Sequence, residues 1–141
     1  MRKRFQLALL LPFLAFTSCD GETVFKGLLW SMQQIAGEGY LPSQELIALG
    51  QFEGVEVQMS QAYGDGGQQS FIELRLFNGK SRQLLHDEEN TARRCAELYV
   101  TEYSKSKAYD NIKVSLIFQD PLEPENYSIR EYVFPTSDLM E

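Results

Sequence analysis

The chain has 141 residues, of which 43% are hydrophobic, and a formal net charge of −7. This length is sufficient for one domain with its own hydrophobic core. The excess of acidic residues argues against a nucleic-acid partner, because binding to a phosphate backbone requires a basic face.

The first eighteen residues have the pattern of a cleaved secretory signal. Basic residues at positions 2–4 precede an apolar run from Phe5 to Phe16, and small polar residues follow. An apolar run of about a dozen residues is shorter than the roughly 20 needed to span the hydrocarbon core. We therefore predict a signal peptide over residues 1–18 rather than a permanent membrane span.

The end of this segment, Phe16-Thr17-Ser18-Cys19, resembles the lipobox of bacterial lipoprotein precursors. Ser18 is small, as in that family, whereas Phe16 departs from its usual aliphatic residue. The resemblance implies cleavage before Cys19, lipidation of the Cys19 thiol and attachment of residues 19–141 to a membrane of the bacterial cell envelope. The alternative is an ordinary signal peptide cut nearby, with Cys19 incidental.

The charge of the remaining chain bears on how it is held at the membrane. Removing residues 1–18 leaves 10 basic residues against 20 acidic ones, a formal charge of −10. Such a chain is not attracted to anionic lipid, so the lipid on Cys19 would have to anchor it. Asp20 resembles an inner-membrane retention signal, whereas acidic residues near the cysteine also resemble a surface-export signal. Inner membrane, outer membrane and cell surface therefore stay open.

Cysteine usage depends on the same modification. If Cys19 carries lipid, Cys95 is the only remaining thiol and no intramolecular disulfide can form. If Cys19 is retained without lipid, a Cys19–Cys95 bridge becomes possible in an oxidising compartment.

The first half of the mature chain predicts helices and then a hairpin. Apolar residues at steps of three and four predict a helix over residues 22–37, which Gly37 and Gly39 end. Ser43 could cap a short second helix. Alternating residues then predict strands over 55–60 and 71–77, and the glycine-rich turn at 64–67 makes them an antiparallel hairpin.

The second half repeats this order. Acidic residues at 87–89 and lysines at 105 and 107 bracket a predicted helix whose apolar stripe includes Cys95. Strands are predicted over 112–118 and 127–134, and Pro135 ends the second. The order α, ββ, α, ββ favours an α+β two-layer sandwich in a single domain over residues 19–141. We expect a largely antiparallel four-stranded sheet with two helices on one face.

The other face of this sheet is the candidate binding face. Polar residues dominate it, but Phe71, Phe77 and Ile117 are expected on it as well. If these three side chains cluster, they mark a partner site. If they are scattered they need no explanation, and we favour that arrangement.

Residues that could carry catalysis or bind a metal are few. His86 is the single histidine, and Cys95 is expected to be buried, so no nucleophile–histidine pair or zinc site is predicted. The turn at 64–67 joins two strands and lacks the helix that a phosphate loop requires. Acidic residues in the 120–126 loop are better explained as solvated charge than as a calcium site. We expect no metal, no cofactor and no catalytic residue.

Three functional hypotheses remain. We favour a non-enzymatic, lipid-anchored binding module for another envelope protein or a cell-wall component. The second hypothesis is a small cell-wall hydrolase that uses His86 with Tyr109 or a carboxylate. The third is a structural or immunity-type lipoprotein, which only its partner would distinguish from the first.

Overall fold

The computed structural model describes residues 30–31 and 34–141. The chain separates into two compact units, Met1–Ile35 and Ala36–Glu141. In the first unit the described residues are helical. The predicted signal peptide, Cys19 and most of the helix expected over 22–37 lie outside the described residues. The second unit holds the α+β domain.

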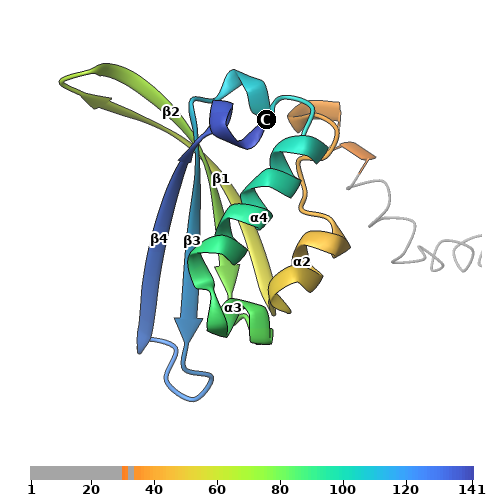
Figure 1. Cartoon of the computed structure of the whole chain (residues 1–141), viewed down its shortest axis with the longest axis vertical. Helices are drawn as coiled ribbons and strands as arrows, with labels where there is room; N and C mark the ends of the chain where they lie inside the picture. The colour runs from red at the N-terminus through yellow and green to blue at the C-terminus, as the bar shows by residue number, and fades with distance from the viewer. Residues whose placement is uncertain (1–29, 32–33) are drawn as a thin grey trace, which may run out of the picture. The chain divides into compact units, whose positions relative to one another are not determined.

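Four strands form one sheet in the order β1-β2-β3-β4 (Figure 1). They are β1 (Gly54–Gly64), β2 (Gly67–Phe77), β3 (Asn111–Gln119) and β4 (Tyr127–Pro135). Each overlaps a predicted strand, and β1 and β2 pair as the predicted antiparallel hairpin, although both extend further towards the turn than predicted. β3 and β4 form a second antiparallel hairpin.

The expectation of a largely antiparallel sheet is wrong at the centre, because the sheet is mixed. β2 and β3 are parallel, with Ile72 opposite Ile112 and Leu76 opposite Leu116. The chain leaves the end of β2, passes through the helices and returns to the end where β2 began. Such a crossover between neighbouring strands makes them parallel.

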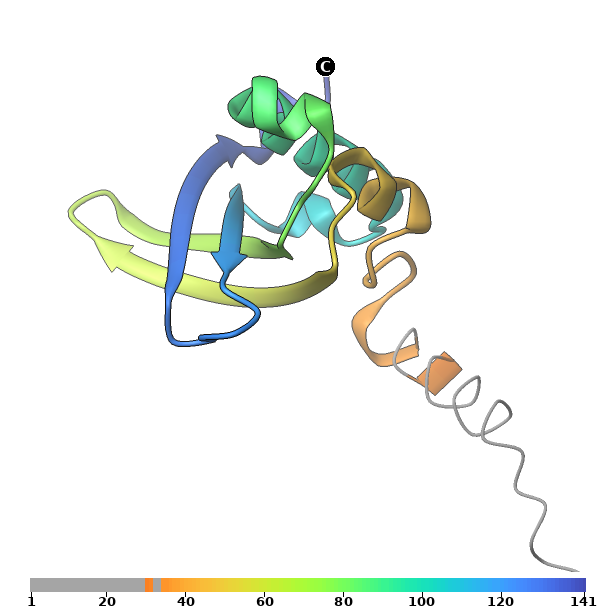
Figure 2. The same ribbon diagram turned by 90° about the horizontal axis from the view of Figure 1, so that it is seen from below.

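The helices of this domain lie against one face of the sheet (Figure 2). They are α2 (Gln44–Gly50), α3 (Arg82–His86) and α4 (Glu88–Glu102). The short helix expected after Ser43 is α2, and the Ser43 hydroxyl accepts the amide of Leu46. α3 was not predicted. Of the two helices expected on this face, α4 is present with the shorter α2 and α3, whereas the helix expected over 22–37 lies largely outside the described residues.

α4 begins where the sequence indicated and ends earlier. The Asp87 carboxylate accepts the amide of Asn90 and caps the first turn. The helix ends at Glu102, so the two lysines at 105 and 107 lie beyond its last turn. Lys107 belongs instead to a short 3-10 helix, η2 (Ser106–Ala108).

The core lies between the sheet and α4. Alternate residues of β2 and β3 are fully buried against the helices: Ile72, Leu74, Leu76, Ile112, Val114 and Leu116. From α4, Cys95 and Tyr99 are fully buried as well. Desolvation raises the pKa of the Cys95 thiol to about 12, so the thiol is neutral and packs as a small apolar group.

Two tyrosines of the α4 region hold the segment that precedes α2. The Tyr99 hydroxyl donates to the carbonyl of Tyr40 at 2.7 Å, and the Tyr103 hydroxyl donates to the carbonyl of Ala36 at 2.8 Å. Gly39 permits this close approach, because its φ is +77° and a Cβ there would collide with the Glu102 carbonyl oxygen.

The β1–β2 hairpin extends beyond the sheet. In β2, residues 71–77 pair with β3, whereas residues 67–70 pair only with residues 61–64 of β1. We call residues 61–70 the hairpin arm. Its residues are exposed except Ser70, which is half-buried. The arm projects away from the helices and past β4 in both views (Figures 1 and 2).

Candidate binding face of the sheet

The face of the sheet opposite the helices is covered by no other element of the described chain (Figure 2). We call it the outer face. Strand register places on it the side chains of Glu56, Gln58, Phe71, Glu73, Arg75, Phe77, Lys113, Ser115, Ile117, Ile129, Glu131 and Val133. All three apolar residues expected on this face are present there.

The structure brings together two of these three apolar residues. Phe77 lies opposite Ile117 in the register, and Ile117 lies opposite Ile129 on β4. Phe71 is six residues from Phe77 along β2, or roughly 20 Å. We call Phe77, Ile117 and Ile129 the apolar row. Ile129 was missed, although the alternation of apolar residues along the last strand could have indicated it.

Charged side chains form pairs beside the apolar row. Arg75 contacts Glu56 at 2.9 Å, and its guanidinium carbon lies 5.5 Å from the centroid of the Phe77 ring. This position combines an ion pair with a cation–π contact. Arg75 thus connects the apolar row to the charged part of the face.

A second set of charges is centred on Lys113. Its ammonium nitrogen lies 2.7 Å from Glu131 and 3.8 Å from Glu73. The hydrogen bond to Glu131 and the nearby charge of Glu73 raise the pKa of Lys113. The Ser115 hydroxyl donates to Glu73 at 2.7 Å. Both cations of the outer face therefore contact carboxylates of neighbouring strands.

The centre of the outer face is shielded by its own side chains. Ser115 is 1% exposed and Ile117 is 4% exposed, although no described element lies over them. The longer side chains on the neighbouring strands therefore enclose these two positions.

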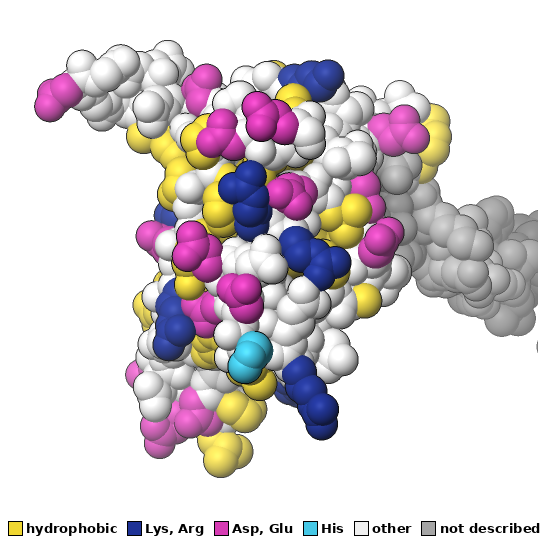
Figure 3. Space-filling view, in the orientation of Figure 1, with side chains coloured by type: hydrophobic (Ala, Val, Ile, Leu, Met, Phe, Trp, Pro, Cys, Tyr) yellow, Lys and Arg dark blue, Asp and Glu magenta, His cyan; other side chains and the backbone are white. Residues whose placement is uncertain are grey.

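His86 is not part of a catalytic arrangement in the described chain. It is exposed on α3 and lines an open hollow with Arg82, Gln83 and Leu85. No hydrogen bond or ion pair joins its imidazole to another described residue. Tyr109, its proposed partner, instead donates to the sulfur of Met59 at 2.7 Å. Figure 3 shows the histidine among charges of both signs on the helix-covered side.

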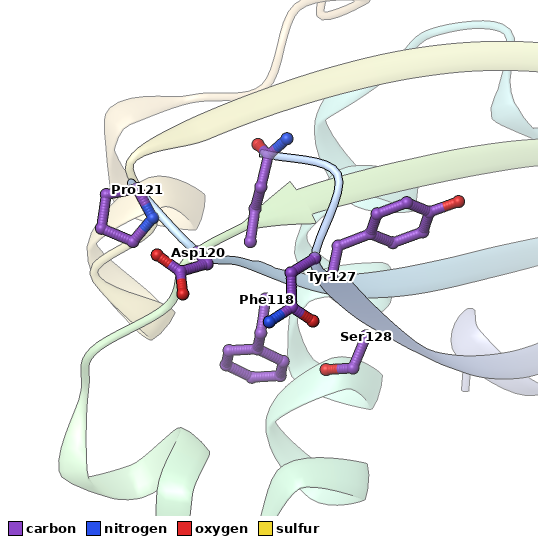
Figure 4. Close-up of a pocket in the computed structure, with 7 residues that line it drawn as sticks. Phe118, Asp120, Pro121, Tyr127 and Ser128 are labelled. Carbon is purple, nitrogen blue, oxygen red and sulfur yellow. The ribbon is translucent and has the colours of Figure 1, made fainter. Parts of the chain in front are cut away.

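The loop between β3 and β4 borders a second open hollow, of about 470 Å³ (Figure 4). Asp120 and Tyr127 both line it, but their polar ends point in opposite directions. The Asp120 carboxylate accepts the amide of Leu122 at 2.8 Å, so it stabilises the turn of the loop. These groups do not converge on a common point, as a catalytic pair would have to.

The described residues contain neither a candidate metal-binding cluster nor a candidate membrane-spanning helix. Within residues 30–31 and 34–141, no three or more His, Cys, Asp or Glu side chains are grouped so that they could hold a metal ion. No helix in that part of the chain has the length and apolar character needed to cross a membrane.

Comparison with known proteins finds no matching family model, and no curated protein or solved structure matches the chain.

Proposed function

We propose that the chain is a lipid-anchored protein of the bacterial cell envelope whose α+β domain is a non-enzymatic binding module. Its outer face would bind another envelope protein or a cell-wall component. The lipobox-like segment ending at Cys19 supports the anchor. The observation that carries the binding role is the outer face itself, which is well packed and is covered by no described element.

The chemistry of this face supports recognition of a partner. Phe77 and Ile129 of the apolar row keep accessible apolar surface that gains free energy when water is excluded, and the adjacent ion pairs supply a polar rim. Since Arg75 and Lys113 are already held by carboxylates, little side-chain entropy is lost when a partner binds. Phe77 connects the apolar row to the ion pairs, because it lies opposite Ile117 and against the Arg75 guanidinium.

The anchor is tested by the intact mass of the protein recovered from the membrane fraction of the producing cell. The expected mass is that of residues 19–141 plus a diacylglyceryl group, with or without an N-acyl chain. In a Cys19→Ser variant this mass should disappear and the protein should leave the membrane fraction. If the protein without this substitution has an unlipidated mass, the result would contradict the proposed anchor.

The binding face is tested separately with a photoreactive amino acid in living cells. At Phe77 it should give a discrete crosslinked product with an envelope component. The matched control is the same amino acid at Gln83, which is exposed on α3 on the helix-covered side. An Arg75→Glu change should reduce the Phe77 product, because it replaces the cation of the Glu56 pair with a second negative charge. Equal products from both positions, or none from Phe77, would exclude the outer face as the binding surface.

A further inference from the structure

β4 is one of the two edge strands of the sheet, and in the described chain its outer edge pairs with no other strand. All nine of its residues pair with β3 on one side. Among the described residues, only those of β3 form hydrogen bonds with the backbone of residues 127–134. The opposite edge differs, because on β1 the Tyr40 hydroxyl donates to the carbonyl of Val57. Unpaired strand edges are templates for pairing with another strand.

The charged residues of β4 do not block this edge. Natural edge strands are often protected by charges in mid-strand. Here Arg130 is engaged by Glu88 of α4 at 3.0 Å on the helix side of the sheet. Glu131 is engaged by Lys113 at 2.7 Å on the outer face. One charge is therefore held on each face of the sheet by another element. The backbone groups along the edge of β4 stay accessible.

We propose that β4 pairs antiparallel with β4 of a second copy, about a two-fold axis at Glu131. The sequence of the strand is self-complementary in this register. On the outer face, Ile129 lies opposite Val133 of the second copy, and the symmetry repeats this apolar pair. On the helix side, Arg130 lies opposite Tyr132 of the second copy, again twice. Both copies then keep their helices on the same side of one continuous sheet.

Other registers that keep the helices on one side fit less well. Moving the axis to Arg130 places that cation opposite itself and Ile129 opposite Glu131. Moving it to Tyr132 places Val133 opposite Glu131. In the proposed register the two copies of Glu131 face each other, but each is already paired with Lys113 of its own chain, which offsets the repulsion.

The hairpin arm supports a second copy at this position. A two-stranded ribbon alone is marginally stable in water, and no described element packs on the outer part of this arm. The arm projects to the side of the molecule where the free edge of β4 lies (Figures 1 and 2). A second copy docked on that edge would provide the surface on which the arm packs.

Disulfide trapping in the full chain tests the register. Cys19→Ser removes the N-terminal thiol, and Cys95 is fully buried. Residues directly opposite each other on antiparallel strands have Cα atoms about 4.5–5.5 Å apart, within reach of a disulfide. Glu131→Cys should therefore form a covalent dimer under mild oxidation.

The matched control is Val133→Cys, which is on the same strand and face. In the proposed register it lies roughly 13 Å from its own copy, and it should not crosslink with itself. A mixture of the Ile129→Cys and Val133→Cys proteins should crosslink into a heterodimer. Equal crosslinking of Glu131→Cys and Val133→Cys, or none in any of these variants, would overturn the proposal.

Sedimentation measures the dimer without a crosslink. The double change Ile129→Lys with Val133→Lys places four ammonium groups against each other, and we expect it to weaken dimerisation at least tenfold. Leu85→Lys, a similar change at an exposed residue of α3, should leave it unchanged. A chain that stays monomeric at every concentration would exclude the dimer. These readouts need no envelope partner, so they do not depend on the proposed function.

Discussion

Ser115 on β3 donates a hydrogen bond of 2.7 Å to the Glu73 carboxylate on β2, and so connects the two central strands by their side chains. The bond lies across the parallel junction, where the two hairpins of the sheet meet. Ser115 is nearly fully buried, although it faces away from the helices. Its contribution to stability should therefore exceed that of an ordinary surface serine.

Ser115→Ala should lower the free energy of unfolding by about 1 kcal/mol, because the buried hydrogen bond to Glu73 is lost while Lys113 still accompanies the carboxylate. Urea unfolding measures the change. The control is Thr101→Ala, an exposed position of α4 whose hydroxyl donates to the carbonyl of Glu97. That substitution should change the free energy of unfolding by no more than about 0.5 kcal/mol. Equal effects at the two sites would show that the Ser115 bond contributes little.

Gly39→Ala should be strongly destabilising. The residue has a positive φ, and the new Cβ would collide with the carbonyl of Glu102. Backbone strain of this kind costs on the order of 1–3 kcal/mol, and relief of the collision would also displace the segment held by Tyr99. Gly66→Ala is the control, because nothing lies within 4 Å of its added Cβ. Thermal unfolding of both variants should show a loss for Gly39→Ala and little change for Gly66→Ala.

The base of the hairpin arm should be sensitive to acid. Hydrogen bonds from the backbone amide and hydroxyl of Ser70 lower the pKa of Asp110 below its ordinary value of 3.8. A carboxyl whose pKa is lower in the folded state stabilises the fold at pH values above its unfolded pKa. That contribution is lost as the pH falls through the folded pKa.

The stability difference between the native chain and Asp110→Asn should therefore shrink as the pH is lowered from about 6 to about 2. Ser70→Ala removes the hydroxyl donor and should raise the pKa of Asp110 towards its ordinary value. Urea unfolding across the pH series measures the first effect, and NMR titration of the carboxyl measures the second. A stability difference that stays constant with pH would contradict this role for Asp110.

Cys95 should be inert in the folded domain. Its thiol is fully buried, and desolvation raises its pKa to about 12, so almost no thiolate is present at neutral pH. In a Cys19→Ser chain, a thiol reagent should react on the order of a hundredfold more slowly with the native protein than with the urea-unfolded protein. Rapid labelling without denaturant would show that α4 opens readily, and would make a Cys19–Cys95 bridge chemically accessible.

The strands could be predicted from the sequence more completely than the sheet. Alternation of apolar and polar residues locates β2 and β3, because each has one face in the core. It contains no information on strand direction. Which strand pairs with β2 depends on how α4 packs over the sheet. Because the chain crosses over the sheet before it pairs β3 with β2, the central pair is parallel. The helix α3 was missed because five residues are too few for a periodic pattern, although Ser81 caps it.

The candidate face could be predicted only in part. Alternate side chains of a strand point to opposite faces, and this alternation placed Phe71, Phe77 and Ile117 on the same side of the sheet. The structure agrees. The alternation does not give the register between strands. It therefore could not show that Phe77 lies beside Ile117 while Phe71 lies far from both. It also gave no sign that Ile117 is shielded by longer side chains around it.

The parallel pairing of β2 with β3 has a consequence for how the chain acquires its structure. Each hairpin closes through contacts that are local in sequence, but the two halves meet only after residues 78–110 have folded back over the sheet. Pairing between distant segments slows folding, because the entropy of loop closure is lost before the contacts form. The return of β3 to β2 is therefore the expected slow step. A chain cleaved between Phe77 and Asn111 would lose the connection that holds its two hairpins in one sheet.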